Sequence, residues 1–129
     1  MFTIDKALGI HTSALELRAK RAEVIANNIA NADTPNFKAR DLDFKATLES
    51  IDRSPKLLST TSKNHISSNE ALSAGKLMYR TPLSVHPNGN SVDNQLEVSA
   101  YTENAMHYQA TVTFLSGKLR GLMSAIRGD

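Results

Sequence analysis

The chain has 129 residues, a formal net charge of +2, a hydrophobic share of 40% and an aromatic share of only 5%. This length suits one domain with a modest core. The small net charge gives no electrostatic basis for binding nucleic acid. The low apolar share predicts a long, thin helical body rather than a compact globule with a deep pocket.

The chain contains no cysteine, which excludes disulfides and thiolate metal sites. Its first residues, MFTIDKALGIHTS, lack both an apolar core of seven residues and a small-residue cleavage site, so we expect no cleavable signal peptide. The longest uncharged run, 104–117, is about fourteen residues long and polar, which is unsuited to crossing a bilayer. If the protein leaves the cytoplasm, another route must carry it.

A first long helix is predicted from Ile4 to about Ala30. Its apolar residues alternate between spacings of four and three, which is the pattern of a coiled-coil seam, with His11 and Arg18 as polar interruptions. We expect Arg18 to lie at an edge or to form an ion pair with Glu97 or Glu103. The apolar positions of this first seam are Leu8, Leu15, Ala22, Ile25 and Ile29.

The stretch 27–44, NNIANADTPNFKARDLDF, joins the end of this helix to an extended segment. Asn27, Asn28 and Asn31 fall where short polar side chains satisfy free backbone groups or tolerate a left-handed conformation. Pro35 keeps Thr34 out of the helical region, so the helix is expected to end before it. Beyond the turn, apolar side chains stand among charged ones, as in a peptide that lies on a surface. They are Phe37, Leu42 and Phe44.

The middle of the chain has weaker signals. A short helix is predicted over 45–52, because Leu48 and Ile51 are three residues apart. From 53 to 91 no period persists, and Ser, Thr, Asn, Pro and Gly dominate. Leu77 and Tyr79 predict short extended pieces within this irregular insert. The turn HPNGNSVD follows, and Asn90 or Ser91 is the predicted cap of the next helix.

The second long helix, from Val92 to Ile126, is the clearest periodic signal. It would extend roughly 50 Å at about 1.5 Å per residue. Gly117 and Gly121 would allow another backbone to approach closely. Nine apolar positions hold the three-four spacing: Val98, Tyr101, Ala105, Tyr108, Val112, Leu115, Leu119, Leu122 and Ile126.

The predicted fold class is mainly α: two long terminal helices pair as an α-helical hairpin or coiled coil around an irregular, partly extended middle segment. The expected segments are 1–32, 33–52, 53–91 and 92–129. Each helix carries more apolar surface than the pair can cover. The sequence therefore predicts a protomer that is completed by its neighbours.

Catalytic and metal-binding patterns are missing from the sequence. The four histidines lack the spacing of metal ligands, so we expect no metal site. Asp41 and Asp43 have no matching acid or base, and there is no serine-nucleophile motif or Gly-rich phosphate loop. We therefore expect no enzyme, no cofactor and no small-molecule substrate.

ANNIANADTPNFKARDLDF resembles the N-terminal signature of the bacterial flagellar axial proteins, and most closely that of the proximal members of the basal-body rod family. The common core of that signature reads as an asparagine pair, I-A-N, a small residue and T-P-G-Y. Asn36 stands where the family usually has Gly, and Asn is the next most tolerant residue of positive φ. At the other end, SGKLRGLMSAIRG resembles the C-terminal end of the same family.

This resemblance implies a structural subunit of the flagellar rod, polymerised through its terminal helices into a helical tube that transmits torque and encloses the export channel. The implied partners are other copies, other rod proteins, ring and adaptor proteins at the rod base, and the flagellar type III export apparatus. The implied location is the periplasm-spanning rod, reached without a cleavable signal peptide. The implied assembly motif is Asn27, Asn28, Asn31, Asp33, Thr34, Pro35, Phe37, Leu42 and Phe44.

Two alternatives stay open. One is another axial flagellar protein, although distal rod and hook proteins of that group carry larger middle inserts. The other is a soluble helical adaptor or export chaperone, which would not need the NNIANADTP element.

Overall fold

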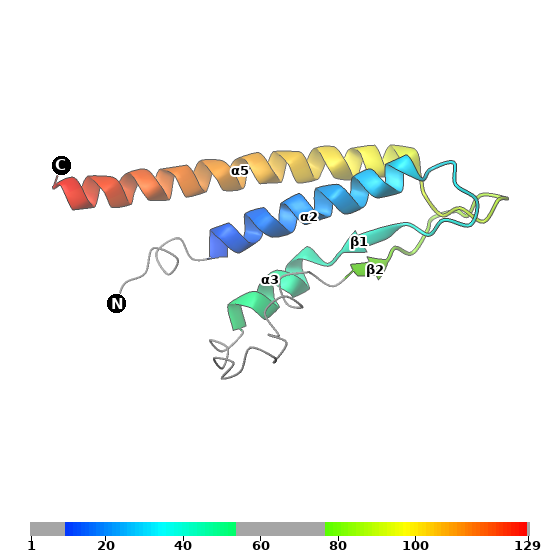
Figure 1. Cartoon of the computed structure of the whole chain (residues 1–129), viewed down its shortest axis with the longest axis horizontal. Coiled ribbons are helices and arrows are strands. Elements are labelled where there is room, and N and C mark those ends of the chain that lie inside the picture. The colour runs from blue at the N-terminus through cyan, green and yellow to red at the C-terminus, as the bar shows by residue number, and fades with distance from the viewer. Residues whose placement is uncertain (1–9, 54–76, 129) are drawn as a thin grey trace, which may run out of the picture.

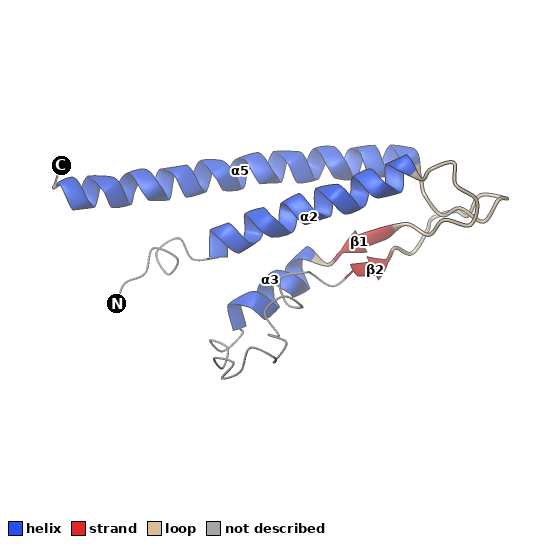
Figure 2. Ribbon diagram, in the orientation of Figure 1, coloured by secondary structure: helices blue, strands red, loops and turns tan. Residues whose placement is uncertain are grey.

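The computed structural model describes residues 10–53 and 77–128 of the chain. The helices α2 and α5 lie side by side and antiparallel, and the small sheet and α3 lie below this helix pair and contact α2 (Figure 1, Figure 2). The mainly α fold, with paired long helices and a partly extended middle, is confirmed. The elements in chain order are α2 (Ile10–Ala30), β1 (Arg40–Leu42), α3 (Phe44–Arg53), β2 (Leu77–Tyr79) and α5 (Asn94–Arg127).

The helix α5 begins after Asp93 rather than after Asn90 or Ser91. The Asp93 carboxylate accepts hydrogen bonds from the backbone N–H groups of Gln95 and Leu96, which is the usual N-cap geometry. The predicted cap was wrong because Asn90 and Ser91 bond to the segment that follows α2. At the other end Gly128, at φ 78°, caps α5 in the left-handed conformation.

The two strands form an antiparallel pair in which Arg40 lies opposite Tyr79 and Leu42 opposite Leu77. The predicted extended conformation at Leu77 and Tyr79 is confirmed. The short predicted helix is also present, as α3, and the side chain of Asp43 accepts a hydrogen bond from the N–H of Ala46 at its start. Of the predicted irregular insert, residues 54–76 lie outside the described part of the chain.

Two segments that are distant in sequence run together beside the small sheet. The N–H of Asn36 bonds to the carbonyl of Asn88, and the N–H of Ser91 bonds to the carbonyl of Phe37. Asn36 has φ 60°, so the positive φ expected at the family's glycine position is confirmed. These bonds fix the turn after α2 against the start of α5.

The face of α5 that meets α2 is polar. Glu97, Asn104 and Thr111 are 1%, 2% and 9% exposed, and their spacing of seven places them on one stripe of the helix. The apolar residues buried in the core are few, and only the first three belong to α2: Ala14, Leu17, Ile25, Ala39, Leu42 and Val92.

The face of α5 that is buried against α2 is the polar stripe and not the apolar seam. The C-terminal seam lies beside the buried stripe, and most of it is exposed, including Tyr101 at 44%, Leu122 at 36% and Ile126 at 85%. Both stripes repeat every seven residues, so periodicity alone could not tell which one faces α2. Hydrogen bonds from Asn28 and Asn104 across the helix pair select the polar stripe.

The N-terminal seam is divided in a similar way. Ile25 is buried, whereas Leu15, Ala22 and Ile29 are partly exposed, and Leu8 lies outside the described residues. Arg18 was expected at an edge or paired with Glu97 or Glu103. Glu103 exerts a Coulomb attraction on its guanidinium, whereas Glu97 does not pair with it. The Glu97 carboxylate bonds to Arg80 instead. The guanidinium of Arg18 lies over the ring of Phe44, 4.2 Å from its centre.

Substituting Gly89 tests the contact between the turn after α2 and the turn that precedes α5. Gly89 has φ 79°, and a Cβ there would collide with the Asn36 Oδ1 atom. We expect Gly89→Ala to lower the free energy of unfolding by about 1–3 kcal/mol. In the control, Gly117→Ala, the new Cβ meets nothing within 4 Å, so stability should rise by up to about 1 kcal/mol. Chemical denaturation measures both, and equal effects would contradict this account of the turn.

Candidate functional site

Asn28, in the last turns of α2, is the centre of a buried polar junction. Its Nδ2 donates to the Arg40 carbonyl at 2.7 Å, and its Oδ1 accepts from the Arg40 N–H at 3.1 Å. The amide therefore pairs with the outer edge of β1 as a neighbouring strand would. Nδ2 also donates to Glu97 Oε2 at 3.1 Å, so one side chain, 1% exposed, joins α2, β1 and α5.

Four charged side chains surround this junction. Arg21 on α2 makes a bidentate contact with Asp41 on β1, at 2.9 and 3.0 Å. Arg80, directly after β2, donates to Asp41 at 2.8 Å and to Glu97 on α5 at 2.7 Å. The charges alternate and sum to zero, so the network links α2, the strand pair and α5 without leaving a net buried charge.

The network changes the titration of its members. Burial would raise the pKa of Asp41, but hydrogen bonds from Arg21, Arg80 and the Leu42 N–H outweigh burial and lower that pKa to about 2. The hydrogen bond to Asp41 raises the pKa of Arg21. Burial, with repulsion from Arg21, lowers the pKa of Arg18. Asp41 is therefore a charged structural residue rather than a proton donor at neutral pH.

Asn90 hydrogen-bonds through its side chain to the backbone that follows the C-terminal end of α2. Its side chain is fully buried, and Nδ2 lies 2.8–2.9 Å from the carbonyls of Asn31, Ala32 and Thr34. These carbonyls lie just past the end of α2, where the backbone has no helical partner. Its Oδ1 accepts from the N–H of Val92 at 2.7 Å, so the amide also fixes the approach to α5.

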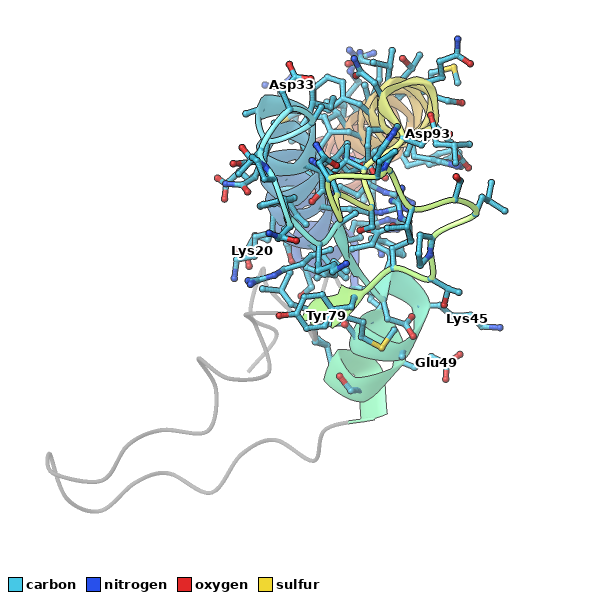
Figure 3. All side chains as sticks on the ribbon, turned by 90° about the vertical axis from the view of Figure 1, so that its right-hand side faces the viewer. Lys20, Asp33, Lys45, Glu49, Tyr79 and Asp93 are labelled. Carbon is cyan, nitrogen blue, oxygen red and sulfur yellow. The ribbon has the colours of Figure 1, made fainter. Side chains whose placement is uncertain are left out.

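The structure separates the predicted assembly motif into two groups. Asn28 and Leu42 are buried, Phe37 is half-buried, and Phe44 lies beneath Arg18. The second group is on the surface, and Asp33 projects outward from the turn (Figure 3). The exposed members are Asn27, Asp33, Thr34 and Pro35, with Asn31 partly exposed and bonded through Nδ2 to the Asn27 carbonyl.

A groove of about 440 Å³ lies between α2 and α5. Small side chains form much of its lining, and two tyrosines of the C-terminal seam lie along it. Asn104 Oδ1 and Arg18 Nε, from residues that line the groove, are buried without a hydrogen-bond partner in the described part of the chain. The lining comprises Arg18, Ala19, Ala22, Tyr101, Asn104, Ala105, Tyr108 and Gln109.

The second half of α5 extends past the described start of α2 (Figure 1). With 34 residues against 21, α5 is roughly 20 Å longer at 1.5 Å per residue. Gly117 and Gly121 face open space within the described structure. Large apolar side chains on this half are exposed: Phe114, Leu119, Leu122, Met123 and Ile126.

Sequence patterns did not reveal the charged network. Arg21 and Arg80 carry no periodic signal, and Glu97 was expected only as one candidate ion-pair partner of Arg18. Only the heptad spacing of Glu97, Asn104 and Thr111 could have indicated a second, polar contact stripe. Within residues 10–53 and 77–128, no cluster of acidic and histidine side chains could hold a metal ion. No helix in that same part is long and apolar enough to cross a membrane.

The fold and junction describe a helical structural protein with more apolar helix surface than one copy covers. The family model described as flagella basal body rod protein matches residues 8–38. The flagellar basal body rod protein FlgB of Aeromonas hydrophila is 43% identical over 98% of this chain and 97% of its own length. FlgB of Escherichia coli K12 is 39% identical, over 96% and 95%.

FlgB of Cereibacter sphaeroides strain ATCC 17029 is 38% identical, over 95% of this chain and 94% of that protein. The chain therefore belongs to the FlgB family of flagellar basal body rod proteins. Its relatives are structural rod proteins and not enzymes.

Removing the Asn28 amide tests the polar junction. Asn28→Ala leaves the Arg40 backbone and Glu97 with fewer partners in a buried site, so we expect a loss of about 3 kcal/mol in the free energy of unfolding. The adjacent control, Asn27→Ala, alters an exposed side chain and should change stability by less than about 0.5 kcal/mol. Urea denaturation followed by circular dichroism compares the two, and a loss common to both would contradict the junction's role.

The depressed pKa of Asp41 predicts acid sensitivity. Because the folded-state pKa, about 2, lies below the ordinary value of 3.8, the contribution of Asp41 is present above about pH 4 and is lost as the pH falls towards 2. Its size is about 1–2 kcal/mol after allowance for partial solvent screening. The stability difference between the natural chain and Asp41→Asn should shrink over this range. A difference that stays constant from pH 5 to pH 2 would contradict the assignment.

Proposed function

We propose that this rod protein polymerises through the exposed apolar faces of α2 and α5 into a helical tube that transmits torque and encloses a central channel. The observation that carries this proposal is the unpartnered seam of α5. Its apolar residues keep one register over nine positions, and most of them are exposed in the single chain. A surface of this kind is characteristic of a protein interface.

The polar packing inside the chain supports this assignment. Glu97, Asn104 and Thr111 are used against α2, so the apolar residues beside them stay available for a neighbour. Burial of each large apolar side chain would contribute about 1.5–3 kcal/mol. Different surfaces of successive copies would meet in such contacts, and contacts that do not close into a ring generate a filament.

The turn after α2 is the proposed second contact. Asp33, Thr34 and Pro35 are exposed, while Asn28 and Asn90 hold the flanking backbone rigidly from inside. A polar turn fixed in this way can meet a neighbouring subunit with little loss of conformational entropy. We propose that this exposed turn, the first part of the predicted 33–44 contact, lies across adjacent subunits.

Other parts of the assignment rest on the family alone. The proposed partners are further copies of this chain, other rod proteins, ring and adaptor proteins at the rod base, and the flagellar type III export apparatus. The proposed position is the proximal, periplasmic part of the rod, reached through that exporter. The lack of cysteine fits a chain that folds after export, since no wrong disulfide can form.

Fractionation of cells tests the proposed function. A tagged copy should co-purify with detergent-resistant basal bodies, and this should depend on an intact flagellar exporter. A soluble, helical protein found only in the cytosol would instead support an adaptor or chaperone.

A charge placed in the seam tests the proposed interface. Leu119 is 39% exposed in the single chain, so Leu119→Asp should change monomer stability by less than about 1 kcal/mol. Incorporation into basal bodies should be lost, because assembly would bury an unpaired carboxylate. The neighbouring Arg120→Asp, on an exposed position outside the seam, is the control and should assemble. Motile cells carrying Leu119→Asp would contradict the proposed seam.

A further inference from the structure

Glu97 is an unusual residue for a helix–helix contact. It is 1% exposed on the face of α5 that meets α2. A carboxylate in such a place needs a bonded cation, because an unpaired buried charge is strongly destabilising. Among the described residues, the cation bonded to Glu97 is Arg80, at 2.7 Å, and Arg80 belongs to neither helix.

The pairing of β1 with β2 positions the Arg80 guanidinium. The Arg80 N–H bonds to the carbonyl of Ala39 at 3.0 Å, continuing the ladder of β1 and β2. The backbone pairing thereby positions the guanidinium between Asp41 and Glu97, at 2.8 and 2.7 Å. Separation of the strands would therefore withdraw the Arg80 guanidinium from Glu97.

The two carboxylates respond differently to that loss. Asp41 keeps its bidentate contact with Arg21. Glu97 keeps the hydrogen bond from the neutral amide of Asn28 and a more distant attraction from Arg21. The free-energy cost of losing the cation would therefore come from the Glu97 carboxylate, which is buried in the interface of α2 and α5.

We propose that docking of the β1–β2 pair is a conformational switch for helix pairing, with Arg80 as the coupling residue. With Arg80 in place, Glu97 is neutralised and α2 packs on α5. Without it, the helices carry a buried uncompensated charge and separate. The groove lined by Ala19, Ala22 and Ala105 needs both helices. If the proposed function holds, the switch also determines when the seam residues that line this groove, Tyr101, Ala105 and Tyr108, are held against α2 for assembly.

Amide hydrogen exchange on the full-length free chain, residue by residue, tests this coupling without requiring assembly. Arg80→Met keeps the aliphatic stem and removes the charge. It should accelerate exchange in α2 and in 97–111 of α5 roughly a hundredfold. The matched control is Arg40→Met on the facing strand, where the guanidinium lies 5.3 Å from the Tyr79 ring. Loss of that contact should change the amide exchange rates in α2 and α5 by less than about fivefold.

A charge-removing second substitution separates coupling from simple damage. Glu97→Gln in the Arg80→Met background should slow helix exchange by about tenfold or more, because no buried charge remains. The same substitution in the natural background should not slow it. The proposal is overturned if Arg80→Met affects only the strands, or if it matches Arg40→Met. It is also overturned if Glu97→Gln changes helix exchange equally in both backgrounds. A natural chain whose helix amides are not protected from exchange would overturn it as well.

Different experiments test the proposed switch and the proposed function, so the two can fail separately. The exchange experiment reports on one free chain, whereas recovery with basal bodies reports on assembly. A chain that is recovered with basal bodies but shows no coupling would overturn the switch alone.

Discussion

The Asn28 amide occupies the place where α2, β1 and α5 meet, and the rest of the structure is arranged around its three hydrogen bonds. Two of them take the place of a missing strand at the edge of β1. The third reaches a carboxylate on α5, which in turn requires Arg80. Buried polar groups are costly when they are only partly satisfied, so such a network favours one arrangement of its parts over others.

This arrangement explains why α5 packs on α2 through its polar stripe. A pair joined by apolar seams would hide the surface that a polymer needs. Hydrogen bonds from Asn28 and Asn104 hold the helices together while Tyr101, Leu119 and Ile126 remain exposed. The internal contact thus depends on hydrogen bonding and charge, and the surface left for neighbours is apolar.

The helices, the turn after α2 and the extended pieces at Leu77 and Tyr79 followed from local rules. Apolar periodicity, Pro35 and the asparagine cluster act over a few residues, and sequence patterns report such effects well. Asn36 adopted the positive φ expected of it. The resemblance at both ends of the chain led to the correct family.

The interior was harder to predict, because its bonds join residues far apart in sequence. Asn90 bonds to carbonyls 56 to 59 positions earlier, and Asn28 bonds to Glu97 at a separation of 69. No local period marks such pairs. The choice between two stripes with the same seven-residue repeat on α5 depended on these distant partners. Apolar periodicity marked the stripe that the single chain leaves exposed, and the polar stripe that meets α2 was not identified.

The central claim is that the exposed seam becomes covered in the rod. Because the chain has no cysteine, Ala105→Cys supplies a single thiol on the seam beside the groove, and its alkylation rate can be measured in the free chain and in isolated basal bodies. Our account predicts rapid alkylation of the free chain and strong protection in the basal body. Equal rates in both states would show that the seam faces solvent in the rod and would contradict the account.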